Sequence, residues 1–374
     1  MTVAGVLGCL GLLWGCEKAP AEPSAAVDAL LTAEISEAGP GVALVVVRDG
    51  IILKKAAYGM ADLEHGVPIE TDTAFRLASV SKQFTAMAIM MLGEAGQLDY
   101  DDPITRFLPD LSRLGDGITI RHLLTHTAGL PDYYDVIVEI SGVERPLTRH
   151  ALDVYSAWGE PVFKPGERYE YSNPGYELLA LIVEKASGQT YAGFVEERIF
   201  APLDMSNSIV FGERARKIEK RAYGYSKSKD SDGYELDDDD PLNYIIGSGG
   251  IYSTVEDMYH WDQGLYGEQL VSHETLEEAF TPNRLNSGEE HPYGFGWGIG
   301  KHLGRRRVAH AGGWVGFDTF IGRYLDDGFS VIVLSNRSGT NARELAGRIA
   351  GLYLDGAGET VSASNRVSAD VHEE

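Results

Sequence analysis

The sequence predicts an α+β fold, in which helices flank one antiparallel sheet and a mostly helical region is inserted. Two observations predict the sheet. Strand-like runs lie near both ends of the chain, and turn sequences at 49–50 and 326–328 join them into hairpins. A third observation predicts the insertion, because residues 84 to about 290 are mostly typical of helix and loop. Segments that are distant in sequence should therefore assemble one sheet.

The N-terminal part of the sheet region covers residues from about 25 to 75. A helix is expected over 25–38, since its apolar residues share one face: Val27, Leu30, Leu31 and Ile35. Strands are expected over 42–48 and 51–58, on either side of Asp49-Gly50. The first strand is apolar over residues 42–47, which predicts burial on both of its faces.

The C-terminal part of the sheet region covers residues from about 291 to 355. A short strand is expected over 307–309, and a hairpin over 314–325 and 329–336. A helix over 341–354 should close the fold, because Leu345, Ile349 and Leu352 recur at helical spacing. The sequence thus predicts one catalytic domain over residues 25–355, with its helical region at about 76–290.

Composition and charge limit the classes of function. The chain has 374 residues, of which 44% are hydrophobic and 24% charged, as in a globular protein with a sizeable core. The net charge of −24 argues against a nucleic-acid partner. The acidic run at 228–240 fits a calcium loop poorly, because Asp239 stands where the final glutamate belongs, and a solvated loop is expected instead. His122 and His126 lack a third zinc ligand and are interpreted as structural, so no metal or other cofactor is expected.

The first 24 residues differ from the rest of the chain. Residues 1–16 contain an apolar run that is too short to span a bilayer and has the form of a signal peptide. The sequence before Cys16 resembles a bacterial lipoprotein cleavage box, which implies lipidation of Cys16; a plain secretory signal is the alternative. Residues 17–24 are expected to be a tether and 356–374 a disordered tail. The protein is expected to be exported to the periplasm or cell envelope, with a lipid anchor as its only membrane contact.

Ser79 and Lys82 form the candidate catalytic pair. An extended segment precedes Ser79, and a helical pattern follows it, so Ser79 is expected in the first turn of a buried helix. Lys82 is three residues on and one turn along the same face. A lysine among apolar side chains loses affinity for its proton and can accept one from a hydroxyl. This chemistry activates a nucleophile.

Ser-x-x-Lys is a loose pattern, and the chain contains a second copy at Ser226 and Lys229. No helical apolar period follows the second copy, which lies in a polar, acid-rich stretch. We therefore interpret it as part of a solvated loop.

Two further motifs accompany the first copy: Tyr171-Ser172-Asn173 in a loop before a helix, and His310-Ala311-Gly312-Gly313 after a strand. Together, the three motifs resemble those of the serine β-lactamase and penicillin-binding-protein superfamily. The nearest branch contains class C β-lactamases, D-Ala-D-Ala carboxypeptidases, D-aminopeptidases and related esterases. The resemblance covers residues 42–354 and implies a β-lactamase/transpeptidase-like fold.

The resemblance also implies a mechanism. Ser79 would attack a carbonyl and form an acyl-enzyme, with Lys82 as the near base. Tyr171 would relay a proton to the leaving group, with Lys82 as one cation that favours its phenolate and a charged His310 as a second candidate. The backbone N–H groups of Ser79 and Gly313 would hold the oxyanion, and Asn173 would orient Lys82 and the substrate.

The third motif departs from the Lys-Thr-Gly of β-lactamases. His310 is only partly charged near neutral pH and Ala311 donates no hydrogen bond, which should weaken the binding of a substrate carboxylate. One of four arginines could compensate: Arg305, Arg306, Arg307 or Arg337. Four aromatic residues could line the rim of the site or belong to the core: Tyr133, Tyr134, Trp297 and Trp314.

Three functions remain open on the sequence. The favoured one is a serine hydrolase of an ester or a D-amino-acyl or amide substrate. The second is a β-lactamase or D-Ala-D-Ala carboxypeptidase, and the third is a module that binds peptidoglycan fragments or β-lactams without turnover. The expected partner is in each case a small molecule or a peptidoglycan-derived compound.

Overall fold

The computed structural model describes residues 23–134, 136–212 and 217–355. The predicted signal peptide, Cys16 and the predicted tail at 356–374 lie outside the described residues, as does nearly all of the tether. Among the described helices, none is long and apolar enough to cross a membrane.

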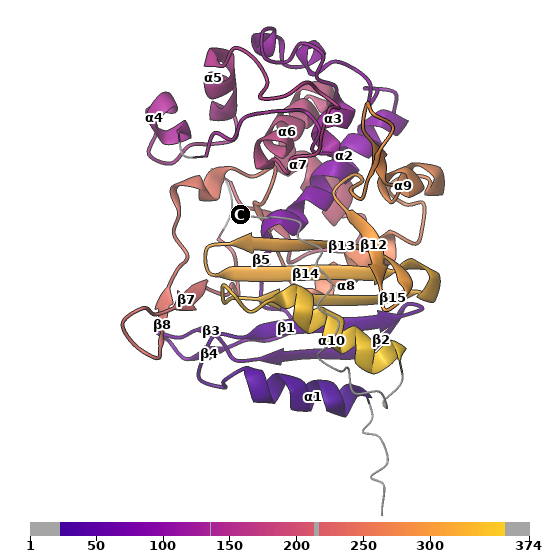
Figure 1. Ribbon diagram of the computed structural model, residues 1–374. Coiled ribbons are helices and arrows are strands. Elements are labelled where there is room, and N and C mark those ends of the chain that lie inside the picture. The colour runs from indigo at the N-terminus through magenta and orange to yellow at the C-terminus, as the bar shows by residue number, and fades with distance from the viewer. Residues whose placement is uncertain (1–22, 135, 213–216, 356–374) are drawn as a thin grey trace, which may run out of the picture.

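A six-stranded antiparallel sheet forms the lower half of the molecule in Figure 1 and has the order β12-β13-β14-β15-β1-β2. Its strands are β1 (Val42–Arg48), β2 (Ile51–Tyr58), β12 (Gly298–His302), β13 (Arg305–Trp314), β14 (Phe317–Tyr324) and β15 (Phe329–Ser335). β1 pairs along its whole length with β15, from Val42 opposite Ser335 to Arg48 opposite Phe329. The two ends of the chain thus build one sheet, as the sequence predicts.

Apolar side chains cover both faces of the sheet. The helices α1 (Pro23–Glu34) and α10 (Ala342–Leu354) pack on one face, and α8 (Val255–Gly264) packs on the other. In β1, Val42, Leu44 and Val46 belong to the core under α1 and α10, whereas Ala43, Val45 and Val47 belong to the larger core on the opposite face. The predicted burial of this strand on both faces is confirmed.

Two strands of the sheet, β13 and β14, differ from the sequence-based expectation. β13 has ten residues, so the strand expected over 307–309 is too short. β14 begins at Phe317, and the strand expected from residue 314 is wrong over its first three residues. The chain turns at Val315-Gly316, where Gly316 has φ +46°, and Trp314 pairs with Phe317 across this tight hairpin. Because this turn contains only one glycine and lies in an apolar stretch, the end of β13 and the start of β14 could not be recognised from the sequence.

The helical region lies above the sheet in Figure 1 and is mostly helix and loop, as expected. Besides α8, its α-helices are α2 (Lys82–Glu94), α3 (Ile120–Leu124), α4 (Ile137–Ser141), α5 (His150–Ala157), α6 (Asn173–Ser187), α7 (Tyr191–Val195) and α9 (His273–Ala279). The region also contains short strands that the sequence reading missed. β5 (Phe75–Arg76), β9 (Ile251–Ser253) and β6 (Ile209–Val210) form a small sheet beside the start of α2.

The remaining short strands form two-residue or three-residue pairs: β3 (Met60–Asp62) with β4 (Val67–Pro68), β7 (Tyr225–Lys227) with β8 (Tyr234–Leu236), and β10 (Asn283–Arg284) with β11 (Glu290–His291). These strands are too short to show a period-two pattern in the sequence.

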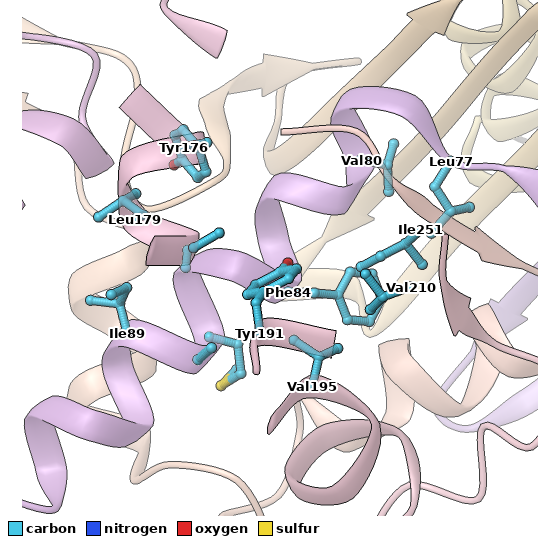
Figure 2. Packing of buried hydrophobic residues seen from close by; sticks show 14 of the residues in the cluster. Leu77, Val80, Phe84, Ile89, Tyr176, Leu179, Tyr191, Val195, Val210 and Ile251 are labelled. Carbon is cyan, nitrogen blue, oxygen red and sulfur yellow. The ribbon is translucent and has the colours of Figure 1, made fainter. Parts of the chain in front are cut away.

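The helix α2 runs through the centre of the larger core. Most of its residues are buried, including Phe84, whose ring packs tilted against that of Trp261 at 4.2 Å between centroids. Figure 2 shows Phe84 and Ile89 packed among side chains of α6, α7 and the small sheet, such as Leu179, Val195 and Val210. Burial of this helix on every side fixes its N-terminal end, where Ser79 and Lys82 lie, with little freedom to move.

Candidate active site

Ser79 lies in a 3₁₀ turn, Ala78–Ser81, that leads directly into α2. Ser79 was expected in the first turn of the helix, but it lies in the turn before α2, which begins at Lys82. The turn is fixed by its neighbours. Ser81 Oγ accepts a hydrogen bond from the Ile251 backbone N–H at 3.1 Å, and the Thr319 hydroxyl donates to the Leu77 carbonyl at 2.7 Å. Ser79 itself is only partly buried, so its hydroxyl lies at the boundary of the core.

Lys82 is fully buried, and its Nζ lies within hydrogen-bonding distance of three oxygens. It is 3.1 Å from Ser79 Oγ, 2.7 Å from Asn173 Oδ1 and 3.1 Å from the Ser248 carbonyl oxygen. The structure thus brings Ser79, Lys82 and Asn173 together, as the sequence pattern predicts. A base at this distance can take a proton from the hydroxyl as it attacks.

Asn173 and Tyr171 are placed by the start of α6. Ser172 is the N-cap of this helix, and its hydroxyl accepts a hydrogen bond from the Gly175 N–H at 3.2 Å. The cap fixes Asn173 as the first helical residue, with its side chain toward Lys82. Tyr171 precedes the cap in an extended loop, and its ring centroid is 4.8 Å from Lys82 Nζ.

The ring of Tyr171 lies near two histidines. Its centroid is 4.3 Å from that of His126 and 6.3 Å from that of His310. His126 also accepts a hydrogen bond at Nδ1 from the Ser172 N–H, at 3.1 Å. His126 therefore supports the Tyr171–Asn173 loop, which agrees with its interpretation as a structural residue.

His310 is buried on β13, and both of its ring nitrogens are hydrogen-bonded. Nδ1 lies 2.6 Å from the Ala311 carbonyl, which can only accept, so Nδ1 carries the hydrogen. Nε2 then accepts from the Tyr293 hydroxyl at 2.8 Å. Burial, with the charge of Lys82 as the next cause, lowers the pKa of His310 to about 3. The expectation that His310 is a partial cation beside Tyr171 is therefore wrong, because burial disfavours its charged form.

Gly313 lies on β13, in the wall of a small cavity. This cavity of about 30 Å³ is lined by Ser79, Asn173, Gly313 and Ser248, among others. Tyr134 and Trp314 also line it, whereas Tyr133 and Trp297 are buried in the core. Two of the four aromatic residues considered for the rim thus lie at the site.

Three of the four arginines considered as substitutes for the missing lysine are paired elsewhere. Arg305 pairs with Asp327, and Arg306 pairs with Glu277 at 2.5 Å. Arg337 donates to Thr340 at 3.2 Å. Arg307 lines a second cavity of about 300 Å³, which has His310 in its wall. Of the four, Arg307 is the one that the structure places near the third motif.

The structure also places residues at the site that the sequence analysis missed. Arg76 lines the small cavity, is 2% exposed, and has no hydrogen-bond partner at Nε or Nη1 among the described residues. The Ser248 carbonyl is a neighbour of Lys82, and Tyr293 is a partner of His310. Arg76 could have been recognised from the sequence, because it is a charged residue between the apolar residues Phe75 and Leu77. No sequence signal identifies a backbone carbonyl.

The second Ser-x-x-Lys copy lies away from this site. Ser226 is in β7, one strand of the β7–β8 hairpin, and its hydroxyl lies 3.5 Å from Glu235. Lys229 lies beyond the end of β7 and is exposed, so it lacks the apolar surroundings that would make it a base for Ser226. The acidic run that follows includes β8 and the connection to residue 240.

Comparison with known proteins places the fold and site in context. The family model described as Beta-lactamase matches residues 25–354. Among curated proteins, penicillin-binding protein 4* of Bacillus subtilis is 39% identical over 77% of this chain and 66% of its own. Esterase EstB of Burkholderia gladioli is 31% identical, over 79% of this chain and 86% of its own. D-aminopeptidase of Brucella anthropi is 28% identical, over 89% of this chain and 62% of its own.

Comparison with solved structures also finds a penicillin-binding protein homologue and an amidase. The octameric penicillin-binding protein homologue from Pyrococcus abyssi has a TM-score of 0.78 at 30% identity, and the match covers 88% of this chain and 77% of that one. D-amino acid amidase from Ochrobactrum anthropi SV3 has a TM-score of 0.75 at 25% identity, covering 90% and 99%. Of several curated relatives, however, this chain spans only about two thirds of the length or less.

Proposed function

This chain belongs to the Beta-lactamase family of serine hydrolases, and we propose that it acts through a Ser79 acyl-enzyme on an ester or on a D-amino-acyl or amide substrate. One observation carries the proposal: Lys82 Nζ lies 3.1 Å from Ser79 Oγ, while Asn173 and the Ser248 carbonyl hold the lysine from its other sides. A buried amine in this position is suited to act as the base for acylation.

The proposed cycle has two steps. The Ser79 hydroxyl transfers its proton to Lys82 as its oxygen attacks the carbonyl carbon, and the backbone N–H groups of Ser79 and Gly313 stabilise the oxyanion. Tyr171 passes a proton to the leaving oxygen or nitrogen as the carbonyl–leaving-group bond breaks. Water then attacks the acyl-enzyme and gives its proton to Tyr171, while Lys82 returns its proton to the Ser79 oxygen as the acyl–oxygen bond breaks.

The third motif supports a substrate without a carboxylate at that position. His310 has a pKa of about 3 and is neutral near pH 7, and Ala311 has no hydroxyl. The motif therefore supplies neither a cation nor a hydroxyl donor to an anionic group. The names of two relatives, an esterase and a D-aminopeptidase, point to the same substrate classes.

The second candidate is a β-lactamase or D-Ala-D-Ala carboxypeptidase. Arg76 favours it, because this cation lines the cavity with Ser79 and lacks partners at two of its nitrogens among the described residues. A penicillin-binding protein also stands among the relatives. A binding module without turnover is the third candidate, and an intact Ser79, Lys82 and Tyr171 set argues against it.

A substrate panel separates the three candidates. Purified protein is incubated with p-nitrophenyl butyrate, D-phenylalanine amide, a D-Ala-D-Ala peptide, a penicillin and a cephalosporin, and both product and protein mass are followed. We expect turnover of the ester or the D-amide and little or no turnover of the lactams. Faster turnover of a lactam or of the D-Ala-D-Ala peptide would establish the second candidate. A stable lactam adduct without turnover of any substrate would establish the third.

A further inference from the structure

A single carboxylate, Glu177, lies in the apolar interior of α6 and has no role in the proposed catalytic cycle. It is fully buried, in a helix whose neighbouring residues from Tyr176 to Val183 are otherwise apolar and buried. Burying an unpaired charge in such surroundings costs free energy, so hydrogen-bond donors are expected around this carboxylate.

Three donors converge on the Glu177 carboxylate. Oε2 accepts from the Thr148 hydroxyl at 2.9 Å and from the Gly247 backbone N–H at 2.8 Å, and Oε1 accepts from the Ser248 backbone N–H at 2.7 Å. Two consecutive backbone amides are thus held by the two oxygens of one side chain. The carbonyl of the second residue, Ser248, is the one that lies 3.1 Å from Lys82 Nζ.

We propose that Glu177 is a positioning residue for Lys82, because it fixes the Gly247–Ser248 backbone so that the Ser248 carbonyl faces Lys82 Nζ. The inference rests on the proposed role of Lys82 as the base. A neutral lysine amine has two N–H donors and one lone pair. In this state the Asn173 side chain and the Ser248 carbonyl accept from the two donors, and the Ser79 hydroxyl, 3.1 Å from Nζ, is placed to donate to the lone pair.

The carboxylate suits this task better than a neutral side chain. Both of its oxygens accept hydrogen bonds, so it can hold two adjacent N–H groups at once. A glutamine would present an NH₂ group to one of those N–H groups, donor against donor, and the Gly247–Ser248 segment would have to move. The acceptor for Lys82 would move with it, although no atom that contacts a substrate would have changed.

The variant Glu177→Gln tests the proposal through the rate of acylation per folded site. Labelling with a fluorophosphonate probe gives two quantities: the fraction of protein labelled at completion, and the rate constant. We expect the rate constant and kcat for p-nitrophenyl butyrate to fall by about tenfold or more, with KM changed less than about twofold and full labelling retained. A residue that only supported the fold would instead lower the labelled fraction and leave the rate constant unchanged.

Two further variants complete the test. Asp262→Asn alters another fully buried carboxylate, which accepts from Arg323 and Ser330, each at 2.7 Å, and it should lower the melting temperature without changing the rate constant. Thr148→Val removes one of the three donors to Glu177 and should lower the rate constant by about twofold to threefold. This milder variant gives the answer if Glu177→Gln does not fold.

A crystal structure of Glu177→Gln, or of Thr148→Val if the first does not fold, separates this inference from the proposed function. We expect the Ser248 carbonyl to move out of hydrogen-bonding distance of Lys82 in Glu177→Gln, and to shift in the same direction in Thr148→Val. A wild-type protein that no probe or substrate acylates would overturn the proposed function, while this displacement would still support the positioning role. An unmoved carbonyl together with a wild-type rate constant would overturn the positioning role alone.

Discussion

Ser79 is held beside Lys82 by a residue with an uncommon backbone conformation. Ala78, immediately before it, has φ +48°, a region that side chains with a Cβ rarely adopt, and it is almost fully buried. The next residues form the 3₁₀ turn, which directs Ser79 toward the small cavity and Lys82 toward the interior. Local strain beside a proposed nucleophile costs on the order of 1–3 kcal/mol, and the packing around α2 must offset this cost.

The variant Ser79→Ala should abolish acylation and leave the fold intact, because it removes one oxygen from a partly buried side chain. Mass spectrometry after exposure to a fluorophosphonate should find wild-type protein labelled once, on the peptide with Ser79, and the variant unlabelled. Thermal unfolding of the two should agree within a few degrees. Labelling that persists in the variant, or that maps to Ser226, contradicts the assignment.

His310 should make stability depend on pH in a defined direction. Its pKa is about 3 in the folded protein and about 6.5 in an unfolded chain, so the unfolded state binds its proton first as the pH falls. The contribution of the neutral, hydrogen-bonded imidazole is therefore complete above about pH 6.5 and is lost progressively as the pH falls toward 3.

Denaturant unfolding of wild-type protein and His310→Gln measures this contribution. Between about pH 6 and pH 4, the free energy of unfolding of the wild type should fall more steeply with decreasing pH, by up to about 1.4 kcal/mol per pH unit. Comparison of the two proteins removes the effect of other buried histidines such as His126. Parallel slopes would mean that His310 is already charged in the folded state.

At the scale of elements, the site is a junction between β13 and the 3₁₀ turn that holds Ser79. Gly312 makes this junction possible, because a Cβ built there would lie 2.3 Å from the Leu77 carbonyl oxygen and 3.1 Å from the Ser79 backbone nitrogen. β14 supports the same turn from behind through Thr319 and Leu77. Because Gly312 has no side chain, β13 can approach the nucleophile more closely than a strand with a larger residue at this position could.

The variant Gly312→Ala should therefore separate β13 from the turn and lower kcat/KM by about a hundredfold or more, since it displaces both proposed oxyanion donors. Gly300→Ala is the matched control. It lies on the neighbouring strand β12, where no described residue other than its two chain neighbours has an atom within 4 Å of the added Cβ, and its activity should match the wild type. Equal activity of the two variants would show that the close approach at Gly312 has no catalytic importance.

The sequence predicted the elements that have strong periodic signals. The strands β1 and β2 were predicted with their observed bounds, and α10 differed by one residue, because Asp49-Gly50 and the apolar spacing of the last helix are local features. The turn at Val315-Gly316 was missed. So was the role of the Ser248 backbone, which depends on Glu177, a residue 71 positions away in sequence. Contacts of that kind arise from tertiary packing and have no local pattern.

At the scale of the whole molecule, the two faces of the sheet have different roles. The face under α1 and α10 is a closed apolar core, formed largely by the two ends of the described chain. The opposite face carries the helical region and the candidate site. The N-terminal helix of the described chain, α1, thus lies on the face of the sheet away from Ser79.

This arrangement bears on the proposed membrane anchor. We propose that the chain is exported and that Cys16, which lies outside the described residues, is lipidated and becomes the first residue of the mature protein. A lipid-modified terminus followed by a short polar tether would hold the protein at the membrane surface without a spanning helix. The net charge of −24 gives no electrostatic attraction to anionic lipids, so membrane binding should depend on the lipid alone.

The variant Cys16→Ser tests the anchor in a bacterial host with lipoprotein processing. Wild-type protein should partition with membranes, resist extraction with high salt and dissolve in detergent, because its attachment is apolar. The variant should be released or remain unprocessed, while its folded domain keeps the melting temperature and the fluorophosphonate labelling rate of the wild type, since α1 begins seven residues later at Pro23. Wild-type protein that is fully soluble outside the cytoplasm would leave the plain secretory signal as the correct reading. Membrane-bound protein that salt removes would point to a protein partner in place of the lipid.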